Sequence, residues 1–389
     1  MFQVDFRRAH TALAALAVIV SAWVLSIGVA AAQNPPAPVI NAKSWMLLDV
    51  SSGQVLASQN ASERIEPASL TKLMTAYLVF SALKAKTITQ EQAVPVSERA
   101  WKMGGSRMFI EPKKPVTVAE LLRGMIVQSG NDACVALAEL IAGSEEAFAG
   151  AMNREAKRLG LKNTTFKNST GWPAPEHLTT AEDLSVLAGA IIRDFPDFYS
   201  LYSIKDYTYN NITQPNRNKL LWVDPNVDGM KTGFTDAAGY CLITSAKRGP
   251  RRLLSVLLGA ASDNARATES QKLLNFGFLN YDSVRLYEKG QGVSQLEVWK
   301  GSARDIKVGF DRELYVTLPK GQADKVKATL VSQKPLIAPI ALGQKIGSMK
   351  VSVDGREIAE VPVVALEAVA GAGVFGRAYD TVRLWFAKS

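Results

Sequence analysis

Histidine and cysteine are scarce in this chain of 389 residues, which contains two of each. A zinc peptidase needs several imidazole or thiolate ligands, and no H-E-x-x-H motif occurs, so we predict no metal site. A Ser-His-Asp triad would have to use His177, because His10 lies in a segment that we expect to be removed, and no G-x-S-x-G motif accompanies it. We interpret His177 as a loop residue that could line a cleft. Glycine-rich phosphate loops are also absent, so no nucleotide or other cofactor is expected.

Cys134 and Cys241 are too few for a disulfide framework. Each lies in an apolar segment, which predicts two buried thiols, although the sequence leaves a single bridge open. The net charge is +9, but 45 basic residues are spread among 36 acidic ones and no nucleic-acid-binding motif is found. We therefore expect no nucleic-acid partner and favour an anionic envelope surface instead.

Three short motifs carry the chemistry, and together they indicate a serine acyl-transferase site. They are Ser69-Leu70-Thr71-Lys72, Ser129-Gly130-Asn131 and Lys231-Thr232-Gly233.

The first motif is predicted to begin a helix, because apolar residues at helical spacing follow Ser69. The unpaired N–H groups at a helix start can stabilise a developing oxyanion. Lys72 lies three residues further on, so its amine falls on the same face as the Ser69 hydroxyl. Apolar surroundings and a second cation at Lys231 could lower the pKa of Lys72 enough for it to act as the base. A second S-x-x-K, Ser81 to Lys84, falls late in the same helix and is given no catalytic role.

The second motif lies between apolar stretches at 118–127 and 133–141, which predicts a short connection between two helices. There Ser129 could relay a proton to a leaving amine, and Asn131 could bind Lys72 or a substrate amide. The alternative is that one of them only caps the next helix.

The third motif precedes two predicted antiparallel strands, at 240–246 and 252–259. On a strand edge, Lys231 and Thr232 could pair with a terminal carboxylate, and Gly233 would allow a substrate backbone to approach closely.

The chain divides into five segments. Residues 1–32 have a basic start, an apolar run and a small-residue cleavage site, which predicts a signal peptide, with an uncleaved anchor as the alternative. Residues 33–38 are a proline-containing linker. Residues 39–285 mix helical and strand patterns, and residues 286–368 are predicted to form a small all-β domain, so the fold class is α+β. Residues 371–389 are predicted to form an amphipathic helix on a membrane, the alternative being a helix docked on the β domain.

The motif set and this layout resemble the low-molecular-weight penicillin-binding proteins that are D-alanyl-D-alanine carboxypeptidases, a peptidase S11-like family. The resemblance implies a β-lactamase/transpeptidase-like catalytic domain, built from an antiparallel sheet with helices. It also implies a periplasmic enzyme attached peripherally to the outer face of the cytoplasmic membrane. The substrate would be a peptidoglycan stem peptide ending in D-Ala-D-Ala, and β-lactam antibiotics would be inhibitors.

The resemblance also implies a role for each motif residue. Ser69 would attack the carbonyl between the two D-alanines after Lys72 takes its proton, and Ser129 would pass that proton to the departing D-alanine. Asn131 would hold the acyl amide, while Lys231 and Thr232 would hold the terminal carboxylate. The backbone N–H of Phe234 would be the second oxyanion donor, beside that of Ser69.

Phe234 departs from the family pattern, because many relatives carry His there, and we expect it to alter pH dependence or substrate fit. Arg266 could add a second carboxylate contact, but we favour a solvated arginine at a helix start. Three alternatives stay open: a serine β-lactamase, for which we find no deacylating carboxylate motif, a D,D-endopeptidase, and a non-catalytic peptidoglycan-binding scaffold.

Overall fold

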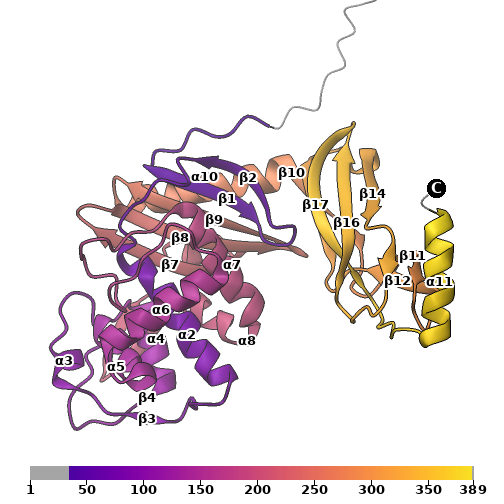
Figure 1. Cartoon of the computed structure of the whole chain (residues 1–389). Coiled ribbons are helices and arrows are strands. Elements are labelled where there is room, and N and C mark those ends of the chain that lie inside the picture. Colours follow the sequence, from indigo (N-terminus) through magenta and orange to yellow (C-terminus); the bar gives the residue numbers. More distant parts are fainter. Residues whose placement is uncertain (1–34, 388–389) are drawn as a thin grey trace, which may run out of the picture.

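The computed structural model describes residues 35–387 and divides them into two parts (Figure 1). The predicted signal peptide and the first two linker residues lie outside the described residues, and residues 35–38 have no secondary structure. A mixed part with helices and a sheet comes first, and an all-β part with one terminal helix follows. The predicted α+β fold class is confirmed.

A five-stranded antiparallel sheet organises the first part, in the order β2-β1-β9-β8-β7. Its strands are β1 (Ser44–Asp49), β2 (Gln54–Gln59), β7 (Val227–Thr235), β8 (Gly239–Arg248) and β9 (Arg251–Ala260). Both faces are buried. Along β9, Leu254 and Val256 belong to one core, whereas Leu253 and Leu257 belong to another, as strand alternation requires. The strand β7, which carries the third motif, lies at the edge of this sheet.

Helices cover both faces of the sheet. They are α2 (Lys72–Lys84), α3 (Glu98–Trp101), α4 (Val118–Val127), α5 (Asn131–Ala142), α6 (Glu145–Leu159), α7 (Ala181–Asp194), α8 (Pro196–Tyr199), α9 (Leu220–Val223) and α10 (Asp263–Asn280), with the 3-10 turns η1 (Ala68–Thr71) and η2 (Ser200–Ser203). Two small antiparallel sheets complete this part. One pairs β3 (Ala93–Val94) with β4 (Val116–Thr117), and the other is a hairpin of β5 (Asp206–Tyr209) and β6 (Ile212–Pro215). Buried Leu73, Met74 and Phe80 show that α2 runs through the core, so the nucleophile motif stands on a rigid element.

The second part contains one two-stranded and one six-stranded sheet around a single apolar core. Its elements are β10 (Tyr281–Tyr287), β11 (Gly292–Trp299), β12 (Asp305–Gly309), β13 (Leu314–Pro319), η3 (Ala323–Lys325), β14 (Val326–Ser332), β15 (Leu336–Ile337), β16 (Lys345–Val353) and β17 (Arg356–Ala365). Thr317 joins it to the first part, because its hydroxyl lies 2.7 Å from Ser52 Oγ and its N–H donates to Gln54 Oε1 at 2.5 Å.

The terminal helix α11 (Val374–Ala387) packs along the β part, on the side away from the first part (Figure 1). Asp380 accepts a hydrogen bond from the Lys300 N–H at 2.6 Å, and Arg383 pairs with Glu297 at 3.4 Å and lies over the Trp299 ring. These side chains hold one side of α11 against the β domain. No helix within residues 35–387 is long and apolar enough to cross a membrane.

Candidate active site

The side chains of Ser69 and Lys72 are in contact. Ser69 lies in the 3-10 turn η1, which runs directly into α2 at Lys72. The helical segment therefore begins where the sequence predicted it, with its first turn in 3-10 rather than α geometry. Lys72 is 2% exposed, and its Nζ has three partners: Ser69 Oγ at 3.0 Å, Asn131 Oδ1 at 2.7 Å and the Thr170 carbonyl oxygen at 2.6 Å. The structure thus brings together residues from the first two motifs and a third segment that the sequence did not indicate.

The partners of Lys72 define where its lone pair can point. A neutral amine has two N–H groups and one lone pair. The Thr170 carbonyl only accepts, and the Asn131 oxygen is oriented toward Lys72 because Asn131 Nδ2 donates to the Gly104 carbonyl at 2.8 Å. These two acceptors use both N–H groups, so the lone pair is left for the Ser69 hydroxyl. That is the arrangement a general base requires.

Both buried lysines are shifted toward the neutral form. Burial lowers the pKa of Lys72, and the positive charge of Arg217 lowers it further, while Asp132 and Glu145 oppose the shift. Burial also holds the pKa of Lys231 well below its usual range, and Lys72 and Arg217 add to that effect. The predicted lowering of the Lys72 pKa therefore has burial as its main physical cause.

The second motif forms the predicted connection between helices, since α4 ends at Val127 and α5 begins at Asn131. Ser129 has a φ of 66°, and its buried hydroxyl has no hydrogen-bond partner among the described residues. Because Ser129 also lines the cleft described below, its hydroxyl is available for a hydrogen bond with a bound molecule. Next to Asn131, the Asp132 carboxylate accepts backbone N–H groups from Met108, Phe109 and Ile110, which fixes a neighbouring loop beside the motif.

The third motif lies on β7 against the nucleophile turn. A Cβ atom on Gly233 would lie 3.2 Å from Ala68 Cβ and 3.3 Å from Leu70 Cγ, so the missing side chain lets this strand pack on η1. Lys231 and Thr232 are buried, and Lys231 Nζ donates to the Thr232 carbonyl at 3.1 Å. Phe234 is 48% exposed, with its ring 4.4 Å from that of Tyr240.

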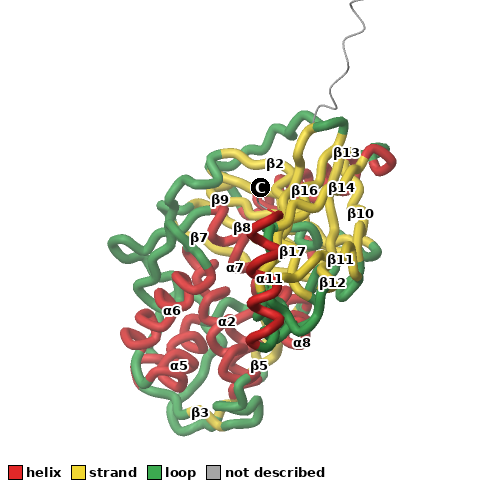
Figure 2. Tube along the Cα trace, turned by 45° about the vertical axis from the view of Figure 1, so that its right-hand side comes forward, coloured by secondary structure: helices red, strands yellow, loops and turns green. Residues whose placement is uncertain are grey.

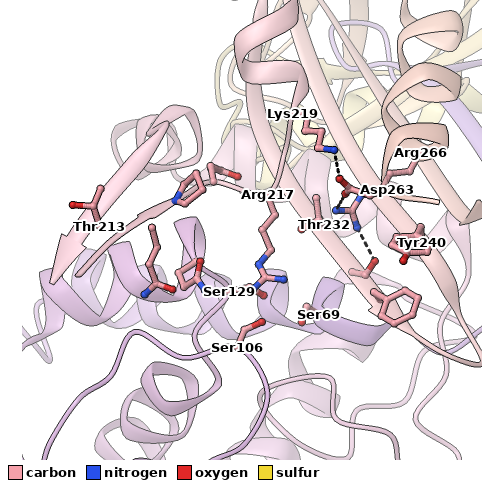
Figure 3. Close-up of a pocket in the computed structure, with 16 residues that line it drawn as sticks. Ser69, Ser106, Ser129, Thr213, Arg217, Lys219, Thr232, Tyr240, Asp263 and Arg266 are labelled. Carbon is pink, nitrogen blue, oxygen red and sulfur yellow. Dashed lines mark hydrogen bonds and ion pairs between the residues drawn. The ribbon is translucent and has the colours of Figure 1, made fainter. Parts of the chain in front are cut away.

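These elements enclose a cleft of about 690 Å³ (Figure 3). It is lined by Ser69, Ser106, Gln128, Ser129, Thr213, Gln214, Pro215, Asn216, Arg217, Lys219, Thr232, Gly233, Phe234, Tyr240, Asp263 and Arg266. The side chain of Arg217 reaches into it between Ser129 and Thr232. Among the described residues that line the cleft, Asp263 is the only carboxylate, and it is paired with Lys219 at 2.5 Å and with Arg266.

Two expectations about single residues are wrong. Arg266 is buried at 6% exposure rather than solvated, because it points from α10 toward β7 and donates to the Gly233 carbonyl at 3.2 Å. His177 lies in a loop, as predicted, but it does not line the cleft. It is buried, its Nε2 lies 3.1 Å from Thr71 Oγ1, and burial lowers its pKa to about 4.

The interpretation of the two cysteines as buried thiols is confirmed. Cys134 and Cys241 are both buried and free, so the bridge that the sequence left open is not formed. In the second S-x-x-K, Ser81 donates to the Tyr77 carbonyl inside α2 and takes no part in the cleft.

The sequence did not indicate Arg217 or Thr170. Arg217 follows the β5–β6 hairpin and is flanked by Asn216 and Asn218, a polar run that signals only a loop. Thr170 contributes a backbone carbonyl, so its side chain gives no clue to its role. Only the tertiary fold brings these groups to the cleft.

Comparisons with known proteins agree with this geometry. Residues 30–262 match the family model of D-alanyl-D-alanine carboxypeptidases, peptidase S11, and residues 281–370 match that of the penicillin-binding protein 5 C-terminal domain. The chain is 44% identical to the D-alanyl-D-alanine carboxypeptidase DacC of Escherichia coli over 92% of this chain and 91% of that protein.

Solved structures show the same likeness. Penicillin-binding protein 5 of Haemophilus influenzae is similar with a TM-score of 0.81 and 42% identity, over 86% of this chain and 99% of that chain. Penicillin-binding protein D2 of Listeria monocytogenes in its ampicillin-bound form is similar with a TM-score of 0.58 and 31% identity, over 63% of this chain and all of that chain (100%).

Proposed function

The chain belongs to the D-alanyl-D-alanine carboxypeptidase family of serine peptidases, and on this basis we propose that it removes the terminal D-alanine from peptidoglycan stem pentapeptides. The observation that carries the proposal is the contact of Lys72 Nζ with Ser69 Oγ at 3.0 Å, with both other partners of Nζ being acceptors. β-Lactams would acylate the same serine, as the ampicillin-bound relative suggests.

In the proposed acylation step, Ser69 Oγ attacks the carbonyl between the two D-alanines while Lys72 takes the hydroxyl proton. By the family resemblance, the backbone N–H groups of Ser69 and Phe234 are assigned to the oxyanion, and the close packing of β7 on η1 at Gly233 supports this assignment. Ser129 passes a proton to the departing amine, so that the C–N bond breaks and D-alanine leaves. The unpaired Ser129 hydroxyl supports this assignment.

Substrate binding is assigned to the cleft around the same residues. Asn131 holds the acyl amide, and Lys231 with Thr232 holds the terminal carboxylate. The cations Arg217 and Arg266, which line the cleft, strengthen the expected preference for an anionic terminus. Water then attacks the acyl carbonyl and releases the shortened peptide and the Ser69 hydroxyl.

The cleft lining supports a carboxypeptidase over a β-lactamase. Rapid deacylation of a penicillin adduct needs a base beside the ester. Asp263, the one carboxylate that residues 35–387 contribute to the cleft lining, is already paired with two cations. We therefore expect a long-lived penicillin adduct.

We also propose that residues 39–285 carry out catalysis and that the segment 371–389 contacts the membrane, with the enzyme acting in the periplasm at the outer face of the cytoplasmic membrane. The exposure of apolar side chains on α11 supports this. Phe375 is 91%, Tyr379 65% and Phe386 66% exposed, and Arg377 lies among them.

The test uses the purified full chain, its Ser69→Ala variant and, as a matched control, Ser81→Ala, which alters the second S-x-x-K. D-Alanine release from a pentapeptide ending in D-Ala-D-Ala and the mass of the penicillin adduct are measured together. We expect both in the wild type and in Ser81→Ala, and neither in Ser69→Ala.

Other outcomes would replace the proposal. Rapid penicillin hydrolysis without D-alanine release would identify a β-lactamase. Preferred cleavage of cross-linked peptides would identify an endopeptidase, and neither activity would favour the scaffold.

A further inference from the structure

A turn formed by residues 168–172, between α6 and α7, holds the Thr170 carbonyl on Lys72. We call it the Asn168 turn, because one side chain organises it. Asn168 Oδ1 accepts hydrogen bonds from Thr170 N at 3.2 Å, Thr170 Oγ1 at 3.0 Å, Gly171 N at 2.8 Å and Trp172 N at 3.1 Å. Its Nδ2 donates to the Trp172 carbonyl at 2.9 Å. The half-buried side-chain amide of Asn168 thus pairs backbone groups of the turn that would otherwise be paired within a helix or a strand.

The neighbouring residue Ser169 is tied to two helices. Glu145, at the start of α6, accepts hydrogen bonds from Ser169 N at 3.0 Å and Ser169 Oγ at 2.7 Å. Thr75 of α2 donates to the Ser169 carbonyl at 2.6 Å. Ser169 is therefore held by both α6 and α2, whereas the side chain of Asn168 holds Thr170, the residue whose carbonyl faces Lys72.

The turn also touches the nucleophile segment directly. Gly171 has a φ of 86°, and a Cβ atom there would lie 1.7 Å from the Ala68 carbonyl oxygen. The Thr170 carbonyl consequently has little freedom to move toward or away from Lys72. A shift of this acceptor would change which partner receives each N–H of the amine, and so where the lone pair points.

We infer that Asn168 is a positioning residue for the proton transfer from Ser69. By fixing the Thr170 carbonyl at 2.6 Å from Lys72 Nζ, it directs the lone pair of Lys72 to the Ser69 hydroxyl. Asn168 itself does not contact Lys72 or line the cleft. The inference rests on the proposed function, because it assumes that Lys72 is the base.

The experiment separates binding from acylation in the full chain. Stopped-flow acylation by a chromogenic cephalosporin gives the dissociation constant of the initial complex and the acylation rate constant. For Asn168→Ala we expect the rate constant to fall about 10- to 100-fold, with the dissociation constant changed by less than about threefold. A purely structural role would not produce this split.

Two further variants make the test specific. Asn168→Asp keeps the acceptor, so on the high-pH plateau, where Lys72 is neutral, its rate constant should stay within about threefold of the wild type. Asn153→Ala is the matched control, since Asn153 accepts from Phe166 N at 2.8 Å and donates to the Phe166 carbonyl at 2.7 Å but does not reach Thr170. It should acylate at close to the wild-type rate.

The inference fails if Asn168→Ala acylates normally, if Asn168→Asp is as slow as Asn168→Ala, or if Asn153→Ala is equally slow. If Asn168→Ala does not fold, Asn168→Ser, which retains a weaker acceptor, replaces it. Asn168→Ser should then acylate more slowly than the wild type, and an acylation rate equal to that of the wild type overturns the inference. Failure of the proposed function would differ, because the wild type itself would then release no D-alanine.

Discussion

At the scale of single residues, Lys72 decides when the site is active, because only its neutral amine can accept the Ser69 proton. Burial and Arg217 lower the pKa of Lys72 from 10.5, so acylation should rise with pH and level off once the pH exceeds this lowered value. Arg217→Ala removes a positive charge that disfavours the ammonium form. The pKa of Lys72 then rises, and the ascending limb of the acylation profile should move to higher pH.

Lys219→Ala is the control for this prediction. Lys219 lines the same cleft, but its charge is paired with Asp263 and is not among the causes of the Lys72 shift. We expect its profile to coincide with that of the wild type. An unchanged limb in Arg217→Ala, or one displaced to lower pH, would show that another group sets the profile.

Phe234 combines two roles that one substitution can separate. Its assigned oxyanion donor is a backbone N–H, which any residue retains, whereas its exposed ring forms part of an otherwise largely polar cleft lining. Phe234→Ala should therefore leave kcat nearly unchanged and raise the KM for the pentapeptide by about 3- to 10-fold through lost apolar contact.

Trp222→Ala is a matched control, because Trp222 is also 48% exposed but does not line the cleft. Its KM should not change. A large loss of kcat in Phe234→Ala would instead mean that the side chain holds the strand in its working position.

At the scale of elements, the contact between the Asn168 turn and η1 depends on Gly171. A Cβ atom there would collide with the Ala68 carbonyl, and φ is also positive. Gly171→Ala should lower the free energy of unfolding by about 3 kcal/mol or more and should abolish penicillin acylation, since either the turn or the nucleophile must shift. Urea unfolding and adduct mass measure the two effects.

Gly143→Ala is the control, because it measures how much a positive φ alone lowers the free energy of unfolding. Gly143 has a φ of 79°, close to that of Gly171, but nothing lies within 4 Å of its Cβ position. The expected loss is about 1 kcal/mol with acylation retained. Equal losses in the two variants would contradict the packing argument.

Local patterns were sufficient to predict the elements of the site. Helical periodicity after Ser69, the turn at Gly130 and the strand patterns on either side of Arg248 all describe neighbours in the chain, and the structure confirms the elements that they indicate. The buried position of Arg266 was missed, because it depends on how α10 packs against β7. The Thr170 carbonyl was missed because a backbone group has no sequence signature.

At the scale of the whole molecule, α11 lies on the side of the β part that faces away from the first part, which carries the cleft (Figure 1). In the view turned by 45°, α11 comes to the front of the molecule (Figure 2). The hydrogen bonds at Thr317 connect the β part to β2 and the segment before it. If α11 lies on a membrane, the β part acts as a spacer that holds the cleft away from the lipid. This arrangement makes membrane attachment and catalysis separable.

The double variant Phe375→Ser with Phe386→Ser tests that separation. Both rings are largely exposed, so their loss should not alter folding, but it removes apolar area that would enter the lipid interface. We expect affinity for anionic phosphatidylglycerol vesicles, measured by co-sedimentation of the full chain, to fall at least about tenfold. D-Alanine release from a soluble pentapeptide should stay at the wild-type rate.

Leu342→Ser is the control, because Leu342 is 69% exposed in the β part but lies outside α11. If it weakens vesicle binding as much as the double variant does, the β domain rather than α11 faces the lipid. If neither variant changes binding, the exposed face of α11 serves another contact. If only the double variant loses affinity for the vesicles, membrane attachment belongs to residues 371–389 and catalysis to residues 39–285.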